Sequence, residues 1–96
     1  MDITVTDAPS ESRFEGLLDT GELAGFLTYR EVGDIYFLNH TEVQPEYGGQ
    51  GVGSRIIRGT LDMVRFQNKQ IIARCPFVVA FLEKHPENRD LVSNRM

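Results

Sequence analysis

Four glycines lie close together in the middle of the chain, at Gly48, Gly49, Gly51 and Gly53. Glycine has no side chain to keep a ligand away from the backbone, so such a loop can offer several N–H groups to one anion. The residues after the loop have helical periodicity, and the first turn of a helix carries about half a positive charge. This combination predicts a binding site for a phosphate or a pyrophosphate.

The loop matches neither of two common nucleotide-binding motifs. It lacks the Gly-Lys-Ser/Thr ending of a P-loop. The third glycine of a dinucleotide-binding motif would fall at Ser54, counting from Gly49, or at Ile56, counting from Gly51. The alternative is a flexible connector without a ligand. Because glycines at a helix start lower the stability of the helix, the phosphate site is favoured over the connector.

Three other side chains suit nucleophilic or acid–base chemistry. Cys75 precedes Pro76, a residue that favours the first turn of a helix, and a helix N-terminus lowers the pKa of a thiol. The thiol could act as a nucleophile, or it could be a small buried residue. His40 and Glu42 could move a proton near neutral pH, or they could be a hydrogen-bonding histidine and a charge at a strand end. These residues are too few for a zinc site, so no metal is expected.

The first half of the chain must position these groups with strands. Turn residues separate four candidates, at 3–6, 13–18, 22–31 and 34–43, with a loop over 7–12. In the last strand a period of two predicts one face with Ile35, Phe37, Asn39, Thr41 and Val43, and another with Tyr36, Leu38, His40 and Glu42. Tyr36 would then share a face with His40 and could line the same site, although cross-strand packing explains its position equally well. Short turns between these strands predict an antiparallel meander.

The second half alternates helix and strand. An apolar stripe predicts a helix from Val52 that ends near Asn68, followed by a strand over 70–74 and a second helix over 77–84. The second helix is apolar on nearly all sides, so we expect it to be buried, with Phe77 and Phe81 in the core. A right-handed crossover would place strand 70–74 parallel to strand 34–43. The expected fold class is therefore mixed α/β, with a mostly antiparallel sheet and β-β-β-β-α-β-α order.

Length and composition narrow the functional class. The 96 residues, of which 41 % are hydrophobic and 25 % charged, predict one globular domain over residues 1–96. A net charge of −4 argues against general nucleic-acid binding, although residues 47–96 hold 8 of the 10 basic residues. With one cysteine, no signal peptide and no apolar stretch of about 20 residues, we expect a cytoplasmic protein that does not enter a membrane.

Several motifs together resemble a known family. The sequence Gly48-Gly49-Gln50-Gly51-Val52-Gly53 is similar to the acetyl-CoA pyrophosphate loop of the GCN5-related N-acetyltransferases, Arg/Gln-x-x-Gly-x-Gly/Ala. With His40-Thr41-Glu42-Val43, Cys75-Pro76-Phe77, His85-Pro86-Glu87 and Asp90-Leu91-Val92, it resembles the small single-domain members of that family over about residues 13–92. One position departs from the pattern. Gly48 stands where the family has Arg or Gln, so a pyrophosphate contact is lost there unless Arg55 replaces it.

The resemblance implies the minimal acyl-CoA N-acyltransferase fold and binding of acetyl-CoA or coenzyme A. The cofactor would lie where strands 34–43 and 70–74 separate, with its pantetheine arm along Thr41–Val43. The N–H of Val43 would face the thioester oxygen, as a fixed dipole that stabilises an oxyanion. The pyrophosphate would lie on the loop and the helix start. The cofactor-binding residues are then Thr41, Val43, Gly49, Gln50, Gly51, Val52, Gly53, Ser54 and Arg55.

The resemblance also implies transfer of the acetyl group to an amine. Glu42 or His40 would remove the proton of the ammonium, or Cys75 would first accept the acetyl group. The chain lacks the insertion that helps larger members recognise an acceptor, so an exposed amine or a protein is the expected acceptor. Two alternatives stay open: a coenzyme A or acyl-CoA binding module without catalysis, and a protein-interaction domain with a vestigial loop.

Overall fold

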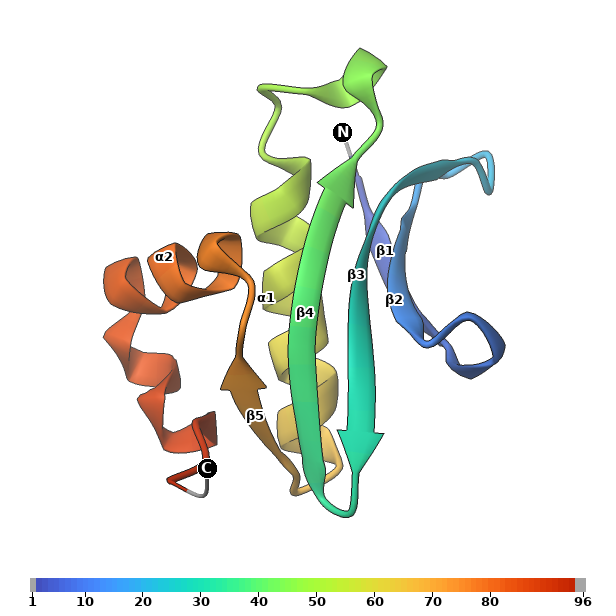
Figure 1. The fold of residues 1–96 in the computed structure, drawn as a ribbon. Coiled ribbons are helices and arrows are strands. Elements are labelled where there is room, and N and C mark those ends of the chain that lie inside the picture. The colour runs from blue at the N-terminus through green and yellow to red at the C-terminus, as the bar shows by residue number, and fades with distance from the viewer. Residues whose placement is uncertain (1, 95–96) are drawn as a thin grey trace.

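The protein forms a five-stranded sheet with two α-helices in a computed structural model that describes residues 2–94 (Figure 1). The strands are β1 (Thr4–Ala8), β2 (Arg13–Leu17), β3 (Leu23–Val32), β4 (Ile35–Val43) and β5 (Gln70–Ala73). The helices are α1 (Val52–Phe66) and α2 (Pro76–Lys84). Short 3₁₀ helices span Pro9–Glu11, Pro45–Tyr47 and Pro86–Leu91. The predicted element order and the mixed α/β class are confirmed.

The strands lie in the order in which they occur along the chain. β1 to β4 pair antiparallel, and β5 pairs parallel to β4, as the crossover predicts. β5 pairs only with the first part of β4, from Ile35 to Leu38. After Ala73, the partner of Leu38, the chain leaves β5 for α2, so the second part of β4 has a free edge on this side (Figure 1).

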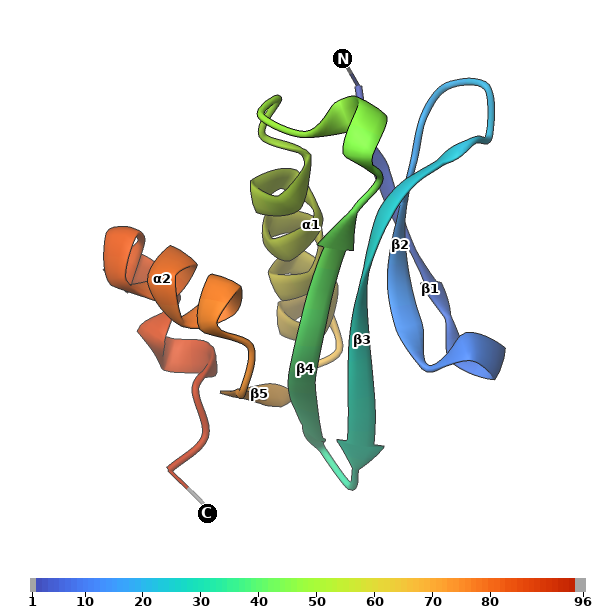
Figure 2. The same cartoon turned by 45° about the horizontal axis from the view of Figure 1, so that its top comes forward.

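Helix α1 covers one face of the sheet, as Figure 2 shows, and forms the core with it. Its apolar stripe is buried as the spacing predicts, with 2 % exposure or less at Val52, Ile56, Ile57, Leu61 and Val64. Opposite this stripe lie buried sheet residues such as Phe14, Leu27 and Leu38. Each fully buried large apolar side chain contributes about 1.5–3 kcal/mol, so this interface holds α1, and with it the glycine loop, in place.

A β-bulge in β4 makes the predicted alternation of its side chains wrong. Thr28 pairs with His40 while Tyr29 pairs with Leu38, so Asn39 is an extra residue. One extra residue moves every later side chain to the other face. The face toward α1 therefore carries Tyr36, Leu38, Thr41 and Val43, and the opposite face carries Phe37, Asn39, His40 and Glu42.

The bulge also separates two residues, Tyr36 and His40, that the period of two places on one face. Tyr36 is buried in an aromatic cluster with Phe14 and Tyr29. His40 is exposed on the other face, so Tyr36 does not line a site with it.

Helix α2 is only half covered, contrary to the prediction of a buried helix. Of its residues only Val78 and Phe81 are buried, and Phe77 is 49 % exposed. The physical reason is position: α2 lies beside the short strand β5 at one edge of the sheet, where it contacts α1 and the Pro86–Leu91 segment on one side only (Figure 1).

The ends of the other elements shift by a few residues. β1 runs to Ala8, so the predicted loop over 7–12 is replaced by the end of a strand and a 3₁₀ helix. Leu91 is buried and Val92 forms a parallel bridge with Ile71, which covers the outer edge of β5.

Candidate functional site

The glycine loop turns the chain sharply between β4 and α1. Gly49 and Gly51 have φ values of +77°, a backbone conformation that side-chain-bearing residues rarely adopt. Gly53 has ordinary helical φ but faces α2, and a Cβ there would lie 3.0 Å from Cζ of Phe77. The glycines at these three positions are therefore explained by the path of the chain and by close packing.

The first turn of α1 presents backbone donors that no side chain caps. Gly51 is the N-cap residue, and it has no side chain to accept a hydrogen bond. The first intrahelical bond runs from Arg55 N to Gly51 O at 3.1 Å, so the N–H groups of Val52, Gly53 and Ser54 have no intrahelical acceptor. The first turn also contains no acidic residue. An anion is the natural partner for these donors.

A pocket of about 310 Å³ lies next to these donors. It is lined by Val43, Tyr47, Gly48, Gly49, Gly51, Val52, Gly53, Ser54 and Phe77. The pocket is thus continuous from the end of β4, past the glycine loop, to the first residues of both helices.

The free edge of β4 borders this pocket. Gln44 N donates to Ala24 O of β3 at 2.8 Å, so the N–H of Gln44 points toward β3. Successive N–H groups of a strand point to opposite sides, so the N–H of Val43 points away from β3, to the edge that β5 does not cover. This donor is positioned to meet an acceptor in the pocket.

Cys75 lies at the N-cap of α2 and is only 4 % exposed. Its Sγ is 3.5 Å from Oγ1 of Thr41, which joins β4 to the start of α2. Burial raises the pKa of the Cys75 thiol, but the hydroxyl of Thr41 stabilises the thiolate and lowers it. Backbone N–H groups at Val78, Phe77 and Thr41 act in the same direction. The net result is a pKa below the ordinary value for a thiol.

His40 and Glu42 lie together on the face of the sheet opposite α1. His40 Nε2 is 3.3 Å from Glu42 Oε1, and the side chains are 60 % and 59 % exposed. The structure therefore brings these two residues together but places them on the other side of β4 from Thr41 and Cys75. Solvent reaches the pair freely, as an acid–base pair for an incoming molecule requires.

The predicted cofactor-binding residues divide into two groups. Six of them line the pocket: Val43, Gly49, Gly51, Val52, Gly53 and Ser54. Thr41 contacts Cys75 instead, and Gln50 is exposed outside the lining. Arg55 lines a separate hollow with Ile3, Val5, Arg58, Gly59 and Asp62, so its replacement of a contact at Gly48 stays a prediction.

Three lining residues were not predicted as cofactor-binding residues: Tyr47, Phe77, and Gly48, where the sequence predicts the loss of a pyrophosphate contact. Tyr47 ends the 3₁₀ helix that leads into the loop, and Phe77 lies two residues after Cys75. The apolar character of Phe77 suggested a core position, and only the edge position of α2 turns its ring toward the loop.

Residues 2–94 contain neither a cluster of metal-ligating side chains nor a membrane-spanning helix. No group of three or more His, Cys, Asp or Glu side chains in this range could hold a metal ion. None of the helices in the same range is long and apolar enough to cross a membrane.

Comparison with known proteins gives a family match for this chain. A family model described as GCN5-related N-acetyl-transferase matches residues 13–91. The search of curated proteins finds no significant match.

Among solved structures, the NMR structure of a GCN5-like protein from Staphylococcus aureus, described there as a proposed N-acetyltransferase, is 30 % identical. The match covers 97 % of this chain and 90 % of that one, with a TM-score of 0.69. A ribosomal-protein-alanine N-acetyltransferase from Brucella melitensis biovar Abortus 2308 shares the fold at 14 % identity and a TM-score of 0.58. That match covers 88 % of this chain and 62 % of the Brucella protein.

Proposed function

The chain belongs to the GCN5-related N-acetyltransferase family, and we propose that it binds acetyl-CoA in the pocket beside the glycine loop and transfers the acetyl group to an amine. The observation that carries this proposal is the continuity of the pocket. It runs from the outward-pointing N–H of Val43 to the uncapped N–H groups of Val52, Gly53 and Ser54.

The residues present fit the chemical groups of acetyl-CoA. The uncapped first turn of α1 offers donors and a positive dipole end to the pyrophosphate. The missing Cβ at Gly53 leaves room where Phe77 approaches the loop. Acetyl-CoA supplies an activated acetyl thioester, and the N–H of Val43 is available to stabilise negative charge on a carbonyl oxygen.

His40 and Glu42 are suited to handle the proton of the acceptor. An amine is protonated near neutral pH and must lose a proton before its lone pair can attack a carbonyl carbon. His40 and Glu42 lie side by side, so this pair offers two groups that can accept a proton and pass it to solvent. In the direct route the amine nitrogen bonds to the acetyl carbon, the carbon–sulfur bond breaks, and coenzyme A leaves as the thiolate.

The lowered pKa of Cys75 favours a second route. The Cys75 thiolate would bond to the acetyl carbon and release coenzyme A as a thiolate, and the amine would then displace the thiol of Cys75. The contact between Cys75 and Thr41 places the thiol on the side of β4 that carries Val43. Both routes use the same pocket and end in the same products.

The test has two parts. Release of free coenzyme A from acetyl-CoA is measured with and without a panel of amines; amine-dependent release supports transfer. Tight binding with no release on any amine would instead support a binding module, and no change in Tm with acetyl-CoA would contradict both readings.

The two routes are separated by mass spectrometry after incubation with acetyl-CoA. An added acetyl mass that is absent from Cys75→Ala supports the covalent route. Amine acetylation at the native rate by Cys75→Ala supports the direct one.

A further inference from the structure

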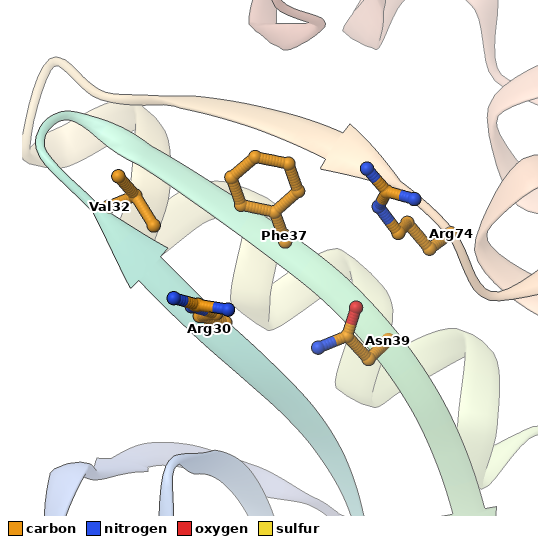
Figure 3. A pocket seen from close by; sticks show the side chains of 5 residues that line it. All are labelled: Arg30, Val32, Phe37, Asn39 and Arg74. Carbon is orange, nitrogen blue, oxygen red and sulfur yellow. The ribbon is translucent and has the colours of Figure 1, made fainter. Parts of the chain in front are cut away.

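A second hollow lies on the face of the sheet away from α1, distinct from the pocket at the glycine loop. It measures about 360 Å³ and is lined by Arg30, Val32, Phe37, Asn39 and Arg74. Figure 3 shows these side chains side by side, from β3, from β4 and from the residue that follows β5. Phe37 forms the floor, and the two guanidinium groups stand on either side of it.

The strand register explains this arrangement. Arg30 of β3 is paired with Phe37, and Phe37 is paired with Ile72 of β5. Arg74, two residues after Ile72, therefore projects from the same face, and its guanidinium carbon lies 5.3 Å from the ring centroid of Phe37. The ring holds one guanidinium by a cation–π contact and leaves its N–H donors free.

Neither guanidinium has a carboxylate partner among residues 2–94. The acidic residues of the neighbouring strands are paired elsewhere: Glu15 with Arg13, Glu42 with His40 and Glu31 with Lys69. The hollow thus concentrates two positive charges in a chain whose net charge is −4. A concave site of this kind attracts anions, and the planar fork of a guanidinium group can bind a carboxylate through two parallel hydrogen bonds.

The hollow shares its face with the His40–Glu42 pair. His40 follows Phe37 by three positions along β4, so the two sites are separated by roughly 10 Å at the rise of a β-strand. An extended peptide covers this distance in about three residues. A peptide whose amino group lies at His40 and Glu42 would place the side chain of its second, third or fourth residue over Arg30 and Arg74.

We propose that the Arg30–Arg74 hollow binds an acidic side chain of a polypeptide acceptor whose free amino terminus lies at the His40–Glu42 pair. The inference rests on the proposed acetyl transfer for the role of the amino terminus, but the binding of the acidic side chain does not depend on transfer. The acceptor is thus an acidic amino-terminal segment, held by charge complementarity on an open face.

The experiment uses five-residue peptides with a free amino terminus and an amidated carboxyl end, so that the tested side chain is the only carboxylate. Glutamate is placed at the second, third or fourth position, with glutamine at the same position as the control. With acetyl-CoA present, we expect the best glutamate peptide to have a KM about tenfold lower than its glutamine control, as charge-assisted hydrogen bonds provide. The preference should vanish in Arg30→Gln and Arg74→Gln and persist in Arg89→Gln, an exposed arginine on another surface.

A binding measurement separates this inference from the proposed function. Titration of the isotope-labelled protein with the same peptides should shift the amide signals of Arg30, Phe37, Asn39 and Arg74 for glutamate and not for glutamine. This result would support the hollow even if no peptide were acetylated. Equal shifts or equal KM values for glutamate and glutamine peptides would overturn the inference, and tighter binding of a phosphoserine peptide would overturn the choice of a carboxylate.

Discussion

Replacing Ser54 by aspartate should weaken coenzyme A binding while stabilising the fold. Ser54 is exposed, lies in the first turn of α1 and lines the pocket. A carboxylate there interacts favourably with the helix dipole by about 0.3–1 kcal/mol, because the native first turn has no acidic residue. For a domain of this size that corresponds to a rise in Tm of about 2–6 °C.

The same carboxylate would repel a pyrophosphate held at this helix end. Two like unit charges about 5 Å apart repel each other by about 1 kcal/mol in water and by about 3 kcal/mol near a protein surface, where the effective dielectric constant is lower. A loss of about 2 kcal/mol raises the Kd roughly 30-fold. Opposite signs for stability and affinity are the diagnostic result, since general damage to the loop would lower both.

Calorimetric titration with coenzyme A checks this expectation, with Ser54→Asn as the neutral control of nearly equal shape. Pantetheine, which lacks the pyrophosphate, should bind Ser54→Asp and Ser54→Asn equally well. The difference between the two variants should shrink as salt is added. Equal coenzyme A affinity of Ser54→Asp and Ser54→Asn at low salt would refute the placement of the pyrophosphate at α1.

Three further outcomes follow from the structure. The midpoint of the pH dependence of Cys75 alkylation should lie below that of an ordinary thiol and should rise in Thr41→Val. An unchanged midpoint in Thr41→Val would show that Thr41 does not stabilise the thiolate. Tyr29→Phe should cost about 1 kcal/mol near pH 7, because the Tyr29 hydroxyl donates to Asp7 at 2.7 Å. Burial, and then Asp7, raise the pKa of Tyr29 in the folded protein above its unfolded value of about 10. The free energy of unfolding should therefore decrease above pH 10, and more in the native protein than in Tyr29→Phe. Parallel urea-unfolding profiles of the two proteins from pH 7 to 11 would contradict this. Gly53→Ala should weaken coenzyme A binding less in Phe77→Ala than in the native protein, with a coupling free energy of about 0.5 kcal/mol or more. Strictly additive changes in the free energy of binding would show that the ring and the loop act independently.

The sequence predicts the elements that build the site better than it predicts which face of β4 each side chain occupies. The glycine loop, the helix after it and the parallel placement of β5 follow from spacing alone, because a period of 3.6 residues and a chain crossover each leave a clear pattern. The bulge at Asn39 leaves no such pattern. Alternation is counted by residue, so one unpaired residue reverses every later assignment, and His40 and Thr41 exchange faces.

Long-range pairing limits the prediction in a second way. Arg30 and Arg74 are far apart in the sequence, and their common hollow depends on two registers, that of β3 with β4 and that of β4 with β5. Composition likewise misleads for α2. An apolar helix is expected in the core, but at the edge of a small sheet only one of its sides finds a surface to cover.

The bulge gives the proposed reaction its geometry. Because Thr41 and Val43 point toward α1 while His40 and Glu42 point away, one short stretch of β4 presents a cofactor side and an acceptor side. β5 stops pairing at Leu38, before this stretch begins, so an acceptor amine could approach from the open face along the uncovered edge of β4. A regular strand would place His40 on the side of the core, where its imidazole would lose solvent and the proton it removes would have no exit. The extra residue at Asn39 therefore supplies what this small sheet otherwise lacks, which is access to the free edge of β4 from two opposite sides.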